Sequence, residues 1–96
     1  PGVAEQALRA VEAADRQDIV LATFDISRPV LEAVRDGNVL FAIDQQMFLQ
    51  TYLSILSLVT HIQYRLAPVA AAPTGPAFIT DENAGEIIEL AGQGIH

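Results

Sequence analysis

The sequence predicts an α/β fold in which parallel strands are covered by helices. Two apolar runs, 19–24 and 39–43, are continuous rather than alternating, which is typical of strands buried on both faces of a parallel sheet. Residues 27–36 lie between them and have the apolar spacing of a helix. The three elements therefore form a strand–helix–strand unit with a parallel crossover. The second run leads into a long helix predicted over residues 46–66.

Local signals mark where these elements begin and end. Apolar side chains at spacings of three and four predict a first helix over residues 3–16. Ser27 is placed to cap the second helix, and Gly37 can adopt the left-handed conformation that ends it. The second helix is therefore bounded by a capping residue at its start and by a residue that favours a turn at its end.

In the last third of the chain, an irregular stretch is expected first, followed by a strand and a helix. Residues 67–76 are rich in proline and should be extended. A short strand at 77–79 and a final helix at 82–91, capped by Thr80 or Asp81, are predicted after it.

Composition excludes several classes of function. The chain has 96 residues and a net charge of −7, and its five basic residues are scattered arginines, so no nucleic-acid surface is expected. The absence of cysteine removes disulfides and zinc–thiolate sites. His61 has no second ligand at helical spacing, and no nucleophile, base and orienting group come together. Neither a metal, nor a cofactor, nor an enzymatic activity is therefore predicted.

Residues 47–62 form the most apolar stretch of the chain. The stretch is shorter than the roughly 18–20 residues of a membrane span, and it contains polar residues such as Gln50 and His61. It is therefore predicted to be a helix buried in a protein core.

Polar side chains follow both predicted strands at the point where each strand ends. Asp25 follows the first strand, and Asp44, Gln45 and Gln46 end the second. Ligands of open α/β sheets bind at this edge. A carboxylate accepts hydrogen bonds and an amide both donates and accepts them, which suits the hydroxyl groups of a ligand. Only one of Asp44 and Gln45 is expected to enter a cleft, because neighbouring strand side chains point to opposite faces.

Each of these residues also has a plainer interpretation. Asp25 alone could be a solvated loop residue or a helix cap, and Gln45 could be the first, solvent-facing residue of the long helix. Phe24 and Phe48 could offer a flat apolar face to a ligand, although filling a core is the commoner role for either ring.

Several separated motifs occur in a characteristic order: a strand ending in Phe24-Asp25, a helix ending in Asp36-Gly37, a strand ending in Asp44-Gln45-Gln46, the aromatic segment 48–52, and the closing segment 74–80. This order resembles the C-terminal part of the substrate-binding proteins of bacterial sugar ABC transporters, the periplasmic-binding-protein type I group with ribose-binding-like members. Thr51 departs from the family pattern, in which glycine is usual.

The resemblance implies a fold and a site. The fold is part of a Rossmann-like three-layer lobe, in which residues 1–45 end the C-terminal lobe and residues 46–96 form a hinge-crossing helix and a closing segment packed on the N-terminal lobe. The chain would be a C-terminal fragment, completed on its own by homodimerisation or by exchange of elements. Asp25 and Gln45 would contact sugar, with the weaker candidates being Phe24, Asp44 and Gln46.

The implied function is the solute-binding component of an ABC importer, which binds a monosaccharide or a similar polyol in a cleft between two lobes. Its partners would be the sugar and a membrane permease. Its location would be periplasmic or extracellular, including lipid-anchored forms on the outer face of the cell membrane. The alternative is the sugar-responsive effector domain of a transcription repressor with the same fold. A signal peptide on the parent chain would favour the first, and a helix-turn-helix motif the second.

Overall fold

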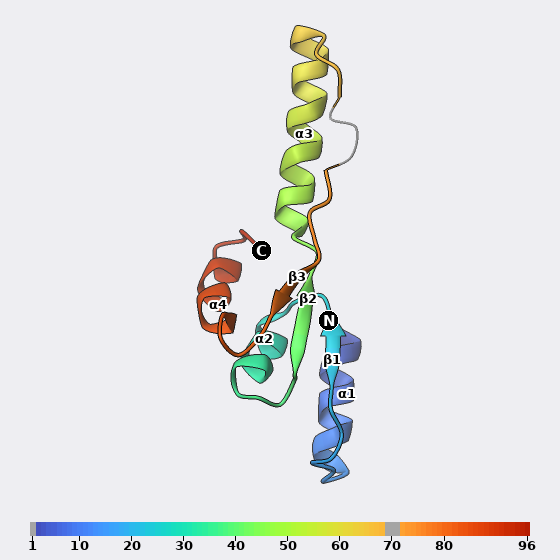
Figure 1. The fold of residues 1–96 in the computed structure, drawn as a ribbon, viewed down its shortest axis with the longest axis vertical. Helices are drawn as coiled ribbons and strands as arrows, with labels where there is room; N and C mark the ends of the chain where they lie inside the picture. The colour runs from blue at the N-terminus through green and yellow to red at the C-terminus, as the bar shows by residue number, and fades with distance from the viewer. Residues whose placement is uncertain (1, 69–71) are drawn as a thin grey trace.

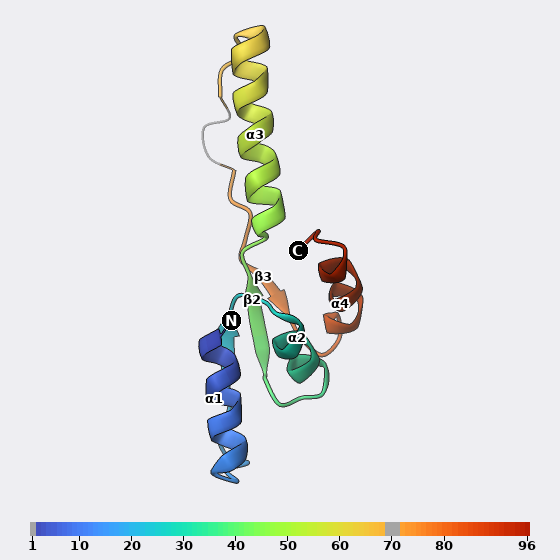
Figure 2. The same cartoon turned by 180° about the vertical axis from the view of Figure 1, so that it is seen from behind.

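A computed structural model describes residues 2–68 and 72–96. Its elements are α1 (Gly2–Ala13), β1 (Ala22–Phe24), α2 (Arg28–Arg35), β2 (Phe41–Asp44), α3 (Met47–Tyr64), β3 (Ala77–Ile79) and α4 (Ala84–Gly92) (Figure 1). The molecule measures 58 × 21 × 19 Å and is elongated because α3 projects away from the other elements (Figures 1 and 2). The predicted α/β fold class is confirmed.

Three short strands form the sheet in the order β1–β2–β3. β1 and β2 are parallel, with Ala22 opposite Phe41 and Phe24 opposite Ile43, as the strand–helix–strand unit predicts. β3 pairs with β2 in the antiparallel direction. The chain leaves β2 towards α3 and returns beside α3, so β3 enters the sheet from the end at which β2 left it (Figure 1).

The core lies between α2 and one face of the sheet. Ser27 is the N-cap of α2, and its hydroxyl accepts a hydrogen bond from the Val30 amide at 3.4 Å. Asp36 is the C-cap, and Gly37 follows with a φ of +82°, so both ends of the helix agree with the prediction. The buried apolar residues are Ala4, Val30, Leu31, Ala33, Val34, Val39, Ala42, Ile79 and Ala84.

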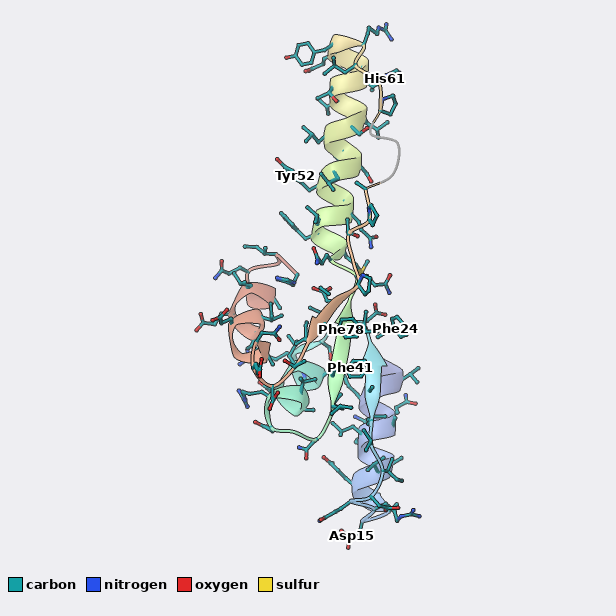
Figure 3. All side chains as sticks on the ribbon, in the orientation of Figure 1. Asp15, Phe24, Phe41, Tyr52, His61 and Phe78 are labelled. Atoms are coloured by element: carbon teal, nitrogen blue, oxygen red, sulfur yellow. The ribbon has the colours of Figure 1, made fainter. Side chains whose placement is uncertain are left out.

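The opposite face of the sheet is open. Figures 1 and 2 show α1 and α2 on the same side of the strands. Phe24 and Phe78 are 64% and 55% exposed, and the rings of Phe78 and Phe41 make a T-shaped contact with their centroids 5.5 Å apart (Figure 3). The prediction of strands buried on both faces is therefore wrong for the described residues, because their helices cover only one face.

The bounds of α3 agree with the prediction, but the burial of its side chains does not. No described residue of α3 is buried, and large apolar side chains such as Tyr52, Ile55 and Ile62 are more than half exposed. The prediction of a buried helix over residues 47–62 is wrong here, because α3 projects beyond the elements that could cover it. Among the described residues, no helix has the length and hydropathy needed to cross a membrane.

Residues 77–96 pack against the first part of the chain. β3 pairs with β2, and α4 lies against α2. This arrangement differs from the expected division of the chain at residue 45, since only α3 and the return segment, whose described residues are 65–68 and 72–76, stand apart. The expected extended stretch 67–76 is irregular at 67–68 and 72–76, and its residues 69–71 lie outside the described residues.

The start of α4 also differs from the prediction. Asn83 is the N-cap residue, in place of Thr80 or Asp81. Its side-chain oxygen accepts a hydrogen bond from the Thr80 amide at 2.9 Å, which closes a turn before the helix begins. The amide side chain therefore stabilises the turn rather than the first helical residues.

We expect Ser27→Ala to lower the free energy of unfolding by about 1 kcal/mol, because it removes the N-cap of α2. The hydroxyl also donates to Glu5 Oε1 at 2.8 Å, which ties α1 to α2. Urea denaturation would measure the change. The same substitution at Ser54, an exposed residue of α3, should change the free energy by less than about 0.5 kcal/mol. Equal effects at the two positions would contradict the capping role.

Candidate functional site

The carboxyl ends of β1 and β2 bring the two main candidate residues together. Asp25 follows β1 directly, and its amide donates to the Ile43 carbonyl of β2 at 2.9 Å. Gln45 follows β2, and its Nε2 donates to Asp25 Oδ1 at 2.9 Å. The predicted pair, 20 residues apart in sequence, is therefore joined by a direct hydrogen bond.

The Asp25–Gln45 pair has hydrogen-bonding capacity that is not used within the pair. Its hydrogen bond uses one N–H of the amide and one carboxylate oxygen, although each group can make several bonds. Gln45 is exposed and Asp25 is half-buried. Asp25 also has a φ of +63°, in the left-handed region, so the chain turns sharply at the edge of the sheet. The pair therefore offers donors and acceptors to solvent from a well-defined position.

Asp44 has a different environment from its neighbour Gln45. It is only 3% exposed, its Oδ1 accepts a hydrogen bond from the Gln46 amide at 2.8 Å, and its Oδ2 lies 2.6 Å from His96 Nδ1. A carboxylate only accepts hydrogen bonds, so the histidine ring donates. Both oxygens of Asp44 are thus engaged within the chain, while Gln45 points outwards, as the alternation of strand side chains predicts.

A surface depression of ≈ 400 Å³ lies beside Gln45, and its walls come from β1, β2, the start of α3 and the return segment. This volume is within the usual range for small-molecule sites. Its lining residues are Phe24, Ile43, Gln45, Gln50, Thr74, Gly75 and Pro76. Phe24 is therefore at the candidate site, whereas Phe48 stacks on Tyr52 along α3.

Sequence reasoning did not identify Gln50 and Thr74 as parts of this site. Thr74 lies in an irregular, proline-containing stretch, and its position depends on how the chain returns from α3. Thr74-Gly75-Pro76, at the start of the closing segment 74–80, was the one available signal, and it contributed to the resemblance to a family rather than to a predicted contact.

The charged groups with shifted pKa values lie away from this edge. The Arg16 guanidinium donates to Asp18 at 2.7 and 2.6 Å, and this hydrogen bonding lowers the pKa of Asp18. The pair precedes β1 and is therefore at the opposite end of the strand from Asp25. No cluster of metal-binding side chains is found among the residues that the structure describes.

Comparison with known proteins identifies a structural relative. No protein-family profile and no curated protein matches the chain. A carbohydrate transporter from Acidothermus cellulolyticus 11B, solved in complex with myo-inositol, matches with a TM-score of 0.86 and 28% sequence identity. The match covers 100% of this chain and 34% of that chain. The fold is therefore that of a fragment of a periplasmic-binding-protein-like α/β lobe.

We expect His96→Ala to lower the free energy of unfolding by about 1.5–3 kcal/mol, because a hydrogen bond to the buried Asp44 carboxylate is lost. Chemical denaturation would measure the effect. His61→Ala, at an exposed position of α3, is the matched control and should cost less than about 1 kcal/mol. If His96→Ala unfolds at the same denaturant concentration as the wild type, the Asp44–His96 contact does not stabilise the fold.

Proposed function

We propose that this chain forms part of the solute-binding component of an ABC importer that binds a monosaccharide or a similar cyclic polyol. The Asp25–Gln45 pair is the observation that carries this proposal. The Asp25 carboxylate can accept a hydrogen bond from one hydroxyl group of such a ligand, while the Gln45 amide N–H donates one to the next oxygen. The charged acceptor makes the shorter and stronger of the two bonds.

The neighbouring surface suits the rest of such a ligand. Phe24 is 64% exposed and lines the depression that also contains Gln45. A flat aromatic face can cover the C–H face of a sugar ring while polar groups at its edge bind the hydroxyls. The structural similarity to a transporter in complex with myo-inositol supports this class of ligand. Asp44 and Gln46 would act here by shaping the turn.

We also propose how the chain is placed in the whole protein. The sheet with α1, α2 and α4 would form the end of one lobe, and α3 would cross to the other. The exposed apolar side chains of α3 support this, because such surfaces are usually buried against another part of a protein. The protein would work outside the cell membrane, in the periplasm or the extracellular space, and deliver its ligand to a membrane permease.

We expect Asp25→Ala and Gln45→Ala each to weaken polyol binding by the full-length protein about tenfold or more, since each removes hydrogen bonds to the ligand. Isothermal titration calorimetry with myo-inositol, D-ribose and D-glucose would measure the dissociation constants. Asp18→Ala and Gln17→Ala are the matched controls at the opposite end of β1, and both should bind like the wild type.

The calorimetry results test the proposed function and the proposed site separately. A wild-type protein that binds none of the three polyols would contradict the proposed function. A wild-type protein that binds one of them, with unchanged affinity in both Asp25→Ala and Gln45→Ala, would contradict the site alone.

We expect the isolated 96-residue chain to form a symmetric dimer. It exposes 6755 Å², whereas a compact protein of 10.3 kDa exposes about 5,400 Å². The difference exceeds the roughly 800 Å² that each partner buries in a stable complex. Size-exclusion chromatography with light scattering at micromolar concentration would measure the mass, and a monomer would contradict the expectation. Ile55→Glu should weaken association, whereas Gln63→Glu, also exposed on α3, should not.

A further inference from the structure

The backbone carbonyl of Gln45 accepts hydrogen bonds from two side chains that are far apart in sequence. Gln50 Nε2, in the first turns of α3, donates at 2.8 Å. Thr74 Oγ1, in the return segment, donates at 3.0 Å. A carbonyl oxygen has two lone pairs, so these two donors fill its capacity.

The return segment also packs tightly against the same stretch of backbone. A Cβ atom on Gly75 would lie 3.2 Å from the Asp44 carbonyl oxygen and 3.7 Å from Gln45 Cα. The first of these distances is too short for a comfortable contact, so glycine allows the segment to approach this closely. Thr74, the residue before it, is thereby held within reach of the Gln45 carbonyl.

The backbone at this point needs such support. Gln46 adopts a left-handed conformation with φ 55° and ψ 56°, between the end of β2 and the start of α3. A residue with a side chain adopts this conformation at a cost of roughly 1–2 kcal/mol, and it persists where neighbouring groups hold it. The peptide between Gln45 and Gln46 is held by Thr74 and Gln50 at its carbonyl and by the Asp44 carboxylate at its N–H.

We propose that Thr74 is a positioning residue for the polyol site. Its hydroxyl group fixes the Gln45 peptide and thereby the direction in which the Gln45 side chain leaves the backbone towards Asp25. This inference rests on the proposed function. Holding a binding group in its bound orientation improves affinity, because less conformational freedom is lost when the ligand binds.

Thr74 should matter more than Gln50 for this role. Gln50 is exposed and only five residues from Gln45, so its bond is local to the start of α3. Thr74 is half-buried and 29 residues away, so its bond also joins the two segments that connect α3 to the sheet. Loss of the Thr74 hydroxyl would release both the peptide and the return segment.

A pair of substitutions at Thr74 in the full-length protein tests the proposal. Thr74→Val replaces the hydroxyl with a methyl group of similar shape, and it should weaken myo-inositol binding roughly three- to tenfold, the usual effect of one lost hydrogen bond. Thr74→Ser keeps the hydroxyl and should bind within about twofold of the wild type. Thr60→Val, whose hydroxyl bonds within α3, is the matched control and should leave affinity unchanged.

A double-mutant cycle with Gln45→Ala shows whether Thr74 acts through Gln45. If it does, Thr74→Val should weaken binding less than about twofold in the Gln45→Ala background, because the amide that it positions is absent. An equal loss in both backgrounds would overturn the proposal, since Thr74 would then contact the ligand itself or act on the fold in general. Unchanged affinity in the single variant would overturn it as well.

A measurement without ligand keeps the proposal testable if the proposed function fails. The side-chain amide signals of Gln45 in an NMR spectrum of the free protein report its position directly. We expect them to be separate from the random-coil position in the wild type and in Thr74→Ser, and to move towards it in Thr74→Val. Identical signals in all three proteins would overturn the positioning role, whether or not the wild type binds myo-inositol.

Discussion

The organisation of the molecule depends on the hydrogen bonds made by the buried carboxylate of Asp44. It accepts hydrogen bonds from the Gln46 amide at the start of α3 and from the His96 ring beyond α4. A buried carboxylate is costly unless it is fully hydrogen-bonded, so the two donors are required where they lie. The carboxylate therefore joins β2, α3 and the end of the chain at one point. Gln45 projects outwards from that same turn, so the hydrogen bonds of Asp44 also fix the position of the candidate site.

The second constraint is that the described elements do not bury all of their apolar surface. α1 and α2 cover one face of the sheet, while the rings of Phe24 and Phe78 and the apolar side chains of α3 stay exposed. This chain spans about a third of the length of the transporter that it matches. An exposed Phe24 beside polar groups suits ligand binding, whereas a long exposed apolar helix suits contact with protein. The two exposed regions therefore call for different explanations.

Most of the local structure could be predicted from the sequence, because its signals are local. Ser27 and Gly37 bound α2 through capping and a left-handed turn, both of which depend on a few adjacent residues. The approach of Asp25 to Gln45 was also predictable, since the carboxyl ends of parallel strands meet at one edge of a sheet. The N-cap of α4 was assigned to the wrong residue, because Asn83 forms a turn with Thr80 that several nearby polar residues could have made.

The sequence by itself determined the order of the elements, the parallel pairing of β1 with β2 and the pair of polar residues at their ends. Periodicity, turn chemistry and the alternation of side chains carry that information along the chain. Only the tertiary structure decided which apolar residues are buried, the antiparallel direction of β3 and the place of Thr74 at the Gln45 carbonyl. These depend on where distant segments meet in space. An apolar stretch such as α3 has the same sequence whether or not another surface covers it.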